Sequence, residues 1–140
     1  MKLNSKGFTL IELMVVIVIL GILAGFITVN YIKYLDEAKV AKTKVEIQEL
    51  ETALDLYRVN NGMYPTTAEG LIALVERPAN AANWKGSYLK KGRIPKDPWK
   101  NDFVYLSPGT RGDYEIISYG RDGNPGGEEF DKDINSWEIE

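Results

Sequence analysis

An acidic segment near the carboxyl end holds the residues best suited to chemistry. The stretch SYGRDGNPGGEEFDKDINSW, residues 118–137, contains four glycines and one proline. Its candidate ligands among carboxylate and amide side chains are Asp122, Asn124, Glu128, Glu129, Asp131 and Asp133. A hard cation such as Ca²⁺ takes six to eight oxygen ligands, and gathering them would fix a loop that is flexible alone. Mg²⁺ fits less well, because it demands stricter octahedral geometry. The pattern is not an EF-hand, so a calcium site and a merely solvated loop both stay open.

Outside this acidic segment, the carboxylate of Glu12 lies inside an apolar run from Phe8 to Val29. An ionised carboxylate in a spanning helix costs on the order of 3 kcal/mol at the centre and less near the interface. Such a residue normally has a partner. If a peptidase cut between Gly7 and Phe8, the new amine of Phe8 would lie one helical turn from Glu12. The amine could pair with the Glu12 of its own chain or of a neighbouring chain, and in a helical bundle the second option would set the register between subunits.

Missing residue types exclude several classes of function. The chain has no histidine and no cysteine, which excludes a Ser-His-Asp hydrolase, a zinc enzyme and disulfides. It also lacks a nucleotide-binding loop of the G-x-x-x-x-G-K-[ST] type. Residues 113–140 carry nine acidic and two basic side chains, net −7, on a nearly neutral body. This distribution favours a cation over nucleic acid as the ligand. The missing residue types and the missing nucleotide loop predict a protein that is not an enzyme.

The apolar run predicts a membrane segment. Its 22 residues would span roughly 33 Å as a helix, about the thickness of a bilayer's hydrocarbon core. Lys2 and Lys6 precede it, which predicts a cytoplasmic amino terminus and a globular part on the other side. The run is too long for an ordinary signal peptide, and GILAGF is a poor cleavage site. A plain anchor remains the simpler alternative, and Glu12 argues against it.

The remainder predicts an α+β domain over 30–140, with a small antiparallel sheet on a long helix. Val40, Ile47 and Leu54 recur every seven residues, and the helix is expected from about residue 8 to 59. A second, short helix is expected from the Thr66 and Glu69 capping box, ending before the proline at 78. Strands are expected at 103–106 and 113–119, with a last strand in SWEIE. The aromatic residues Trp99, Tyr105, Tyr114 and Trp137 are expected to pack in the core or under loops. A lysine-rich patch is expected to be a solvated face, with contact to the acidic side of a neighbouring subunit as the alternative; it comprises Lys85, Lys90, Lys91, Arg93 and Lys96.

The amino-terminal run KGFTLIELMVVIVILGILA resembles the signal of type IV pilins and pseudopilins. The resemblance implies a leader peptide over residues 1–7, cleavage between Gly7 and Phe8 by a prepilin peptidase, and N-methylation of Phe8. It assigns Glu12 to assembly. Residues 8–29 would then be the transmembrane segment of the precursor and the core helix of a filament.

The soluble part is similar to the major pseudopilins of type II secretion systems. The blocks LETALDLYRVNNGMYPTTAEGLIALVERP, YLKKGRIPKDPWKNDFVYLSPG and YEIISYGRDG carry this resemblance. Major type IV pilins usually close a carboxy-terminal loop with a disulfide, which this chain cannot form. The pseudopilin is therefore the main interpretation, with a type IV pilus subunit for adhesion, motility or DNA uptake as the alternative. A membrane-anchored enzyme or binding module is a more distant one.

The resemblance also implies ligands and partners. It predicts Ca²⁺ bound by the Tyr119 carbonyl, Asp122, Asn124, Asp131 and Asp133. It predicts a homopolymer whose partners are minor pseudopilins, the prepilin peptidase and the inner-membrane assembly platform. It predicts no binding of nucleic acid. The precursor would cross the inner membrane once, with its globular domain in the periplasm, and would then enter a filament that drives protein export.

Overall fold

A computed structural model describes residues 7–139, apart from the side chains of residues 27–30. Residues 1–6 of the predicted leader peptide, which include Lys2 and Lys6, lie outside the described residues, as does Glu140.

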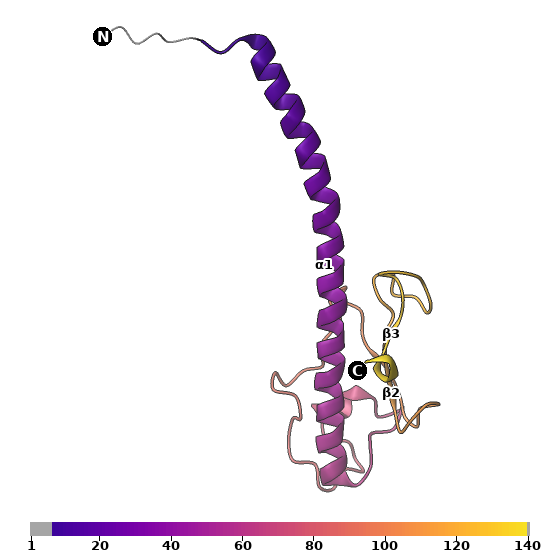
Figure 1. The fold of residues 1–140 in the computed structure, drawn as a ribbon. Coiled ribbons are helices and arrows are strands. Elements are labelled where there is room, and N and C mark those ends of the chain that lie inside the picture. Colours follow the sequence, from indigo (N-terminus) through magenta and orange to yellow (C-terminus); the bar gives the residue numbers. More distant parts are fainter. Residues whose placement is uncertain (1–6, 140) are drawn as a thin grey trace, which may run out of the picture. The chain divides into compact units, whose positions relative to one another are not determined.

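The longest element is the helix α1, Leu10–Asn61 (Figure 1). It confirms the long helix predicted from the sequence, which has no proline between residues 8 and 64. The helix ends where Gly62 adopts φ 83° and donates its N–H to the Arg58 carbonyl at 2.7 Å. Glycine is the residue that takes this left-handed conformation without steric cost.

The chain forms two compact units, residues 1–36 and 37–140. In the described part of the first unit, the large apolar side chains of α1 lie on the surface. The predicted boundary at 29/30 between membrane segment and globular domain stays a prediction.

The core of the second unit lies between the later part of α1 and the elements that follow. Ile47, Leu50 and Leu54 are completely buried, and Tyr57 is nearly so. They form one cluster with apolar residues of the loops and strands, including Leu74 and Ile116. The apolar stripe predicted on the helix is therefore its packed face.

A three-stranded antiparallel sheet lies along this part of α1, in the order β1-β2-β3 (Figure 1). Its strands are β1 Val104–Leu106, β2 Glu115–Ser118 and β3 Ile134–Asn135. Tyr105 pairs with Ile116 and Ser118 pairs with Ile134, and all four side chains are buried. The α+β class, a long helix on a small antiparallel sheet with a carboxy-terminal loop, is confirmed.

Two local predictions need correction. The short helix after Tyr64 is only one 3₁₀ turn, η1 Leu71–Leu74, although the predicted capping box of Thr66 and Glu69 forms before it. The last strand in SWEIE is wrong, because β3 ends at Asn135 and a 3₁₀ turn, η2 Ser136–Glu138, follows. At this point the N–H of Ile116 donates to the Ser136 hydroxyl at 3.1 Å. The Ser136 side chain thus accepts the hydrogen bond that a backbone carbonyl would accept if β3 were longer.

Candidate functional site

The predicted cleavage junction lies in irregular backbone just before α1. Residues 7–9 have no regular secondary structure and are all exposed. The Phe8 side chain is 74% exposed. Exposed irregular segments are the ones that proteases reach most readily, so the Gly7–Phe8 bond is accessible in the described chain.

Glu12 forms a capping box with Thr9 at the start of α1. Its Oε2 accepts hydrogen bonds from the N–H and the hydroxyl of Thr9, both at 2.8 Å. The Thr9 hydroxyl accepts in return from the N–H of Glu12 at 3.3 Å. Both bonds to the carboxylate reach the same oxygen, which leaves Oε1 for a further donor. The structure thus holds the Glu12 carboxylate on the turn that follows the predicted cleavage junction.

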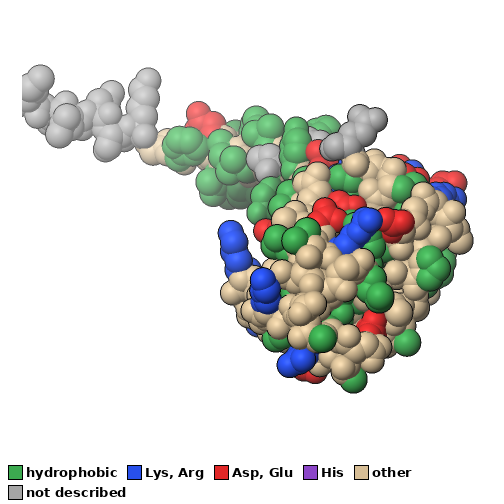
Figure 2. Space-filling model, turned by 90° about the horizontal axis from the view of Figure 1, so that it is seen from below, with side chains coloured by type: hydrophobic (Ala, Val, Ile, Leu, Met, Phe, Trp, Pro, Cys, Tyr) green, Lys and Arg blue, Asp and Glu red, His purple; other side chains and the backbone are tan. Residues whose placement is uncertain are grey.

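The surface around Glu12 is apolar. From Leu10 to Phe26 the large apolar side chains that lie on the surface are between 41% and 78% exposed. Figure 2 shows hydrophobic side chains covering the part of this helix in view. Glu12 is the single charged residue from Gly7 to Phe26. Within the described residues, α1 is the one helix that is long and apolar enough, by length and composition, to cross a membrane. An exposed apolar surface of this extent is typical of a membrane or protein contact.

Hydrogen bonds and close backbone packing hold the base of the acidic loop, residues 119–133, together. The N–H of Arg121 donates to the Phe130 carbonyl at 3.1 Å, and the Asn101 amide donates to the Gly120 carbonyl at 3.2 Å. Gly120 has φ 63°, and a Cβ there would lie 2.9 Å from the carbonyl oxygen of Lys132. Only glycine permits this close approach of the two sides of the loop.

The predicted metal ligands in this loop are partly engaged with other groups. Asp131 accepts a forked pair of bonds from Arg121, 2.8 Å from Nε and 3.1 Å from Nη2. Asp133 Oδ2 accepts from the Gly126 N–H at 2.9 Å, and Asp122 Oδ1 accepts from the Asn124 N–H at 3.0 Å. The bonds from Arg121 are the main reason that the pKa of Asp131 lies below its ordinary 3.8.

The loop has the donors for a hard cation without having gathered them. Asp133 Oδ1 is buried and lacks a hydrogen-bond partner among the described residues, which is costly for a carboxylate oxygen unless a cation approaches. Tyr119, whose carbonyl is a predicted ligand, follows β2 directly. In the part of the chain that the structure describes, however, no three acidic side chains lie close enough together to hold a metal ion. The donor chemistry fits Ca²⁺, and binding would require the acidic side chains of the loop to come closer together.

A groove of about 720 Å³ runs between α1 and residues 88–96. We call it the basic groove, because its lining includes Lys42, Lys90, Lys91, Arg93 and Lys96. Lys90, Lys91 and Arg93 are exposed, as predicted for the lysine-rich patch. The groove adds a concave surface that the sequence did not reveal.

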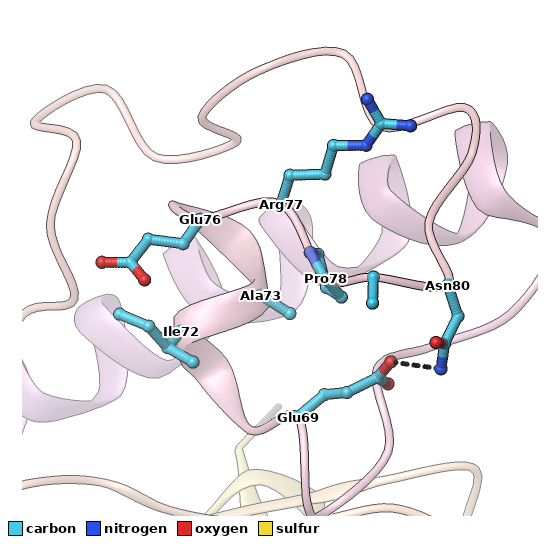
Figure 3. A pocket seen from close by; sticks show the side chains of 8 residues that line it. Glu69, Ile72, Ala73, Glu76, Arg77, Pro78 and Asn80 are labelled. Atoms are coloured by element: carbon cyan, nitrogen blue, oxygen red, sulfur yellow. Dashed lines mark hydrogen bonds between the residues drawn. The ribbon is translucent and has the colours of Figure 1, made fainter.

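A smaller hollow of about 310 Å³ beside η1 has polar groups that already serve the fold (Figure 3). Glu69 accepts from Thr66 in the capping box and from the Asn80 amide at 3.2 Å. Arg77 donates to the carbonyls of Ala81 and Ala82. This hollow is a product of the η1 turn and not a candidate for chemistry.

Comparison with known families decides between the pilin and pseudopilin interpretations. The family described as type II secretion system (T2SS), protein G, matches residues 30–137. The chain belongs to this protein G family. The prokaryotic N-terminal methylation motif matches residues 2–28, which include the Gly7–Phe8 junction and Glu12.

Members of the protein G family are similar to this chain over almost its whole length. The type II secretion system core protein G of Vibrio cholerae is 48% identical over 140 residues, covering 98% of this chain and 94% of that protein. The core protein G of Pseudomonas aeruginosa is 47% identical over 139 residues, covering 96% of each. The crystal structure of the major pseudopilin of the enterohaemorrhagic Escherichia coli type 2 secretion system matches with a TM-score of 0.65 and 39% identity, over 74% of this chain and 90% of that one. The major pseudopilin interpretation is confirmed, and the type IV pilus alternative gains no support.

Sequence reasoning missed two buried carboxylates that hold the protein G fold together. Asp97 Oδ1 accepts from the N–H groups of Trp99 and Asn101, and its Oδ2 accepts from the Ser118 hydroxyl at 2.7 Å. Glu115 Oε1 accepts from Thr110 and Arg111 in the β1–β2 turn. The aspartate before a proline in KDPWKND was a turn signal, but nothing local indicated its partner in β2.

Proposed function

We propose that this protein G family member is the structural, non-enzymatic subunit of a type II secretion pseudopilus, which polymerises into a helical filament and drives export of folded proteins across the outer membrane. The observation that carries the proposal is Glu12, a single carboxylate on an apolar helical surface one turn from an accessible Gly7–Phe8 bond. In lipid this charge is costly unless it is paired. Pairing of the Glu12 carboxylate with the Phe8 amine of a neighbouring subunit would offset this cost and would set the register between the two subunits.

The Gly7–Phe8 junction is proposed as the prepilin peptidase site, with N-methylation of Phe8 after cleavage. The match to the methylation motif and the irregular backbone of residues 7–9 support this step. Before assembly the precursor would cross the inner membrane once through the start of α1, with the globular part in the periplasm. Assembled subunits would then cover one another's apolar helices, and head-to-tail contacts that do not close would generate a fibre.

The proposed partners follow from the secretion system to which the family belongs. They are other copies of this chain, minor pseudopilins, the prepilin peptidase and the inner-membrane assembly platform. A deletion strain that loses exoprotein release and keeps twitching motility supports a secretion pseudopilin. The opposite phenotype supports the type IV pilus alternative.

We also propose that the acidic loop binds Ca²⁺ through the Tyr119 carbonyl, Asp122, Asn124, Asp131 and Asp133. The Oδ1 of Asp133, which is buried and has no hydrogen-bond partner within the described residues, supports this assignment. The ion would neutralise carboxylates that repel one another and would hold the loop closed. EGTA should therefore lower the melting temperature of the folded chain, measured by circular dichroism, and an unchanged transition would argue against a structural metal.

The test of assembly is Glu12→Gln, which keeps the side chain's shape and removes its charge. We expect the precursor to remain in the membrane, because the apolar helix is unchanged, and filaments detected by shearing and cross-linking to fall at least tenfold. Glu37→Gln, at an exposed carboxylate of the same helix, is the matched control and should assemble normally. Normal filament yield with Glu12→Gln would show that the Glu12 charge does not govern assembly, and a wild-type chain that forms no filaments would favour a membrane-anchored binding module instead.

A further inference from the structure

Arg121 is held by its backbone next to the predicted ligand Asp131. Its N–H donates to the Phe130 carbonyl at 3.1 Å. Next to it, Gly120 packs closely against the backbone carbonyls of residues 130–132, so the two sides of the loop base are held together. From there the guanidinium reaches both oxygens of Asp131, at 2.8 and 3.1 Å. A forked arginine–carboxylate pair is the strongest geometry for such a contact.

The pair occupies the carboxylate that a cation in the loop would need. Both oxygens of Asp131 already face a positive charge, whereas Asp133 Oδ1 is buried without a partner among the described residues. A guanidinium and a divalent ion on one carboxylate repel each other, and solvent screens part of the repulsion because the Arg121 and Asp131 side chains are 49% and 33% exposed. Arg121 in this position therefore opposes metal binding to Asp131.

We infer that Arg121 is an internal counter-ion that competes with Ca²⁺ for Asp131, closing the acidic loop before metal binds and lowering the loop's apparent affinity for the ion. This inference rests on the calcium site proposed above. Arg121 is a positioning residue in this scheme: it holds Asp131 in place until Ca²⁺ replaces it. The loop then has two closed forms, one held by a guanidinium and one held by a metal ion.

The matched variants are Arg121→Gln, Arg121→Lys and Lys132→Gln. Arg121→Gln removes the competing cation, and Arg121→Lys keeps its charge but loses the fork. Lys132→Gln removes one positive charge from the same loop, at a side chain whose ion pair within the described residues is a 3.8 Å approach to Glu138. It reports the effect of net charge alone.

The experiment is calorimetric titration of CaCl₂ into the full-length chain in detergent micelles at fixed ionic strength. We expect Arg121→Gln to lower the Kd for Ca²⁺ roughly three- to tenfold, Lys132→Gln to lower it less than about twofold, and Arg121→Lys to fall between the wild type and Arg121→Gln. Thermal unfolding gives a second readout. In EGTA, Arg121→Gln should melt roughly 2–4 °C below the wild type, and saturating Ca²⁺ should remove that gap.

The outcomes separate this inference from the calcium proposal. If the wild type binds Ca²⁺ and Arg121→Gln changes the Kd no more than Lys132→Gln does, competition by Arg121 is wrong and the calcium site stands. If only Arg121→Gln binds Ca²⁺, competition is supported and is strong enough to exclude the ion from the wild type. If no chain binds Ca²⁺, both the site and the competition are wrong.

Discussion

At the scale of single residues, Glu115 shows how a carboxylate can hold a turn in place. Its Oε1 accepts from the Thr110 hydroxyl at 2.6 Å, the Thr110 N–H at 2.8 Å and the Arg111 N–H at 2.9 Å. The hydroxyl bond is the largest cause that holds the pKa of Glu115 below its ordinary 4.5, against the opposing effect of burial. The ionised form is therefore the one that the folded β1–β2 turn favours.

Acid should remove this contribution of Glu115. Because its pKa is lowered in the folded state, the stabilisation is fully present above about pH 4.5 and is lost as the pH falls through the lower, folded pKa. The difference in free energy of unfolding between the wild type and Glu115→Gln should be largest near neutral pH and shrink below pH 4.5. Urea unfolding over a pH series measures it, with the exposed Glu76→Gln as control. A gap that does not change with pH would contradict the assignment.

At the scale of elements, the sequence predicts structure well where the signal is periodic or local. The stripe of Ile47, Leu50 and Leu54 is a repeating pattern, and the predicted capping box of Thr66 and Glu69 lies within four residues of sequence. The last strand was wrong because Ser136 bonds to Ile116, 20 residues away, and no local pattern reports such a partner. The same limit applies to the acidic loop: its composition indicated a cation, but the Arg121–Asp131 pair depends on how the chain folds back.

The close packing at the base of the acidic loop gives a prediction about two glycines that have almost the same φ angle. Gly92 has φ 60° and Gly120 has φ 63°, but a Cβ meets nothing within 4 Å at Gly92 and a carbonyl at 2.9 Å at Gly120. Gly92→Ala should cost only the left-handed conformation, about 1 kcal/mol of unfolding free energy. Gly120→Ala should cost about 2–4 kcal/mol, because crowding against the backbone adds to it. Urea denaturation measures the loss of unfolding free energy in each variant. Equal losses would mean that the backbone around Gly120 shifts to accept a Cβ at no extra cost.

At the scale of the whole molecule, charge separation within the globular unit suits head-to-tail assembly. Figure 1 draws residues 88–96 and the acidic loop on opposite sides of the later part of α1. Among the ion pairs of the described residues, Lys42 pairs with Glu46 and Lys96 with Asp102, while none includes Lys90 or Lys91. A fibre needs two different faces on one subunit, and opposite charges on them would favour the correct contact over others.

Reversing the charge of the basic groove should therefore weaken assembly without weakening the fold. The double variant Lys90→Glu and Lys91→Glu changes two exposed side chains, so its melting temperature should stay within about 2 °C of the wild type. We expect several-fold fewer filaments by shearing and cross-linking, because a neighbour's carboxylates would then meet like charge. The control pair Lys85→Glu and Lys100→Glu alters net charge equally at exposed positions outside the groove lining. If both pairs reduce filaments equally, net charge and not the groove governs the contact; if neither does, the groove faces solvent in the filament.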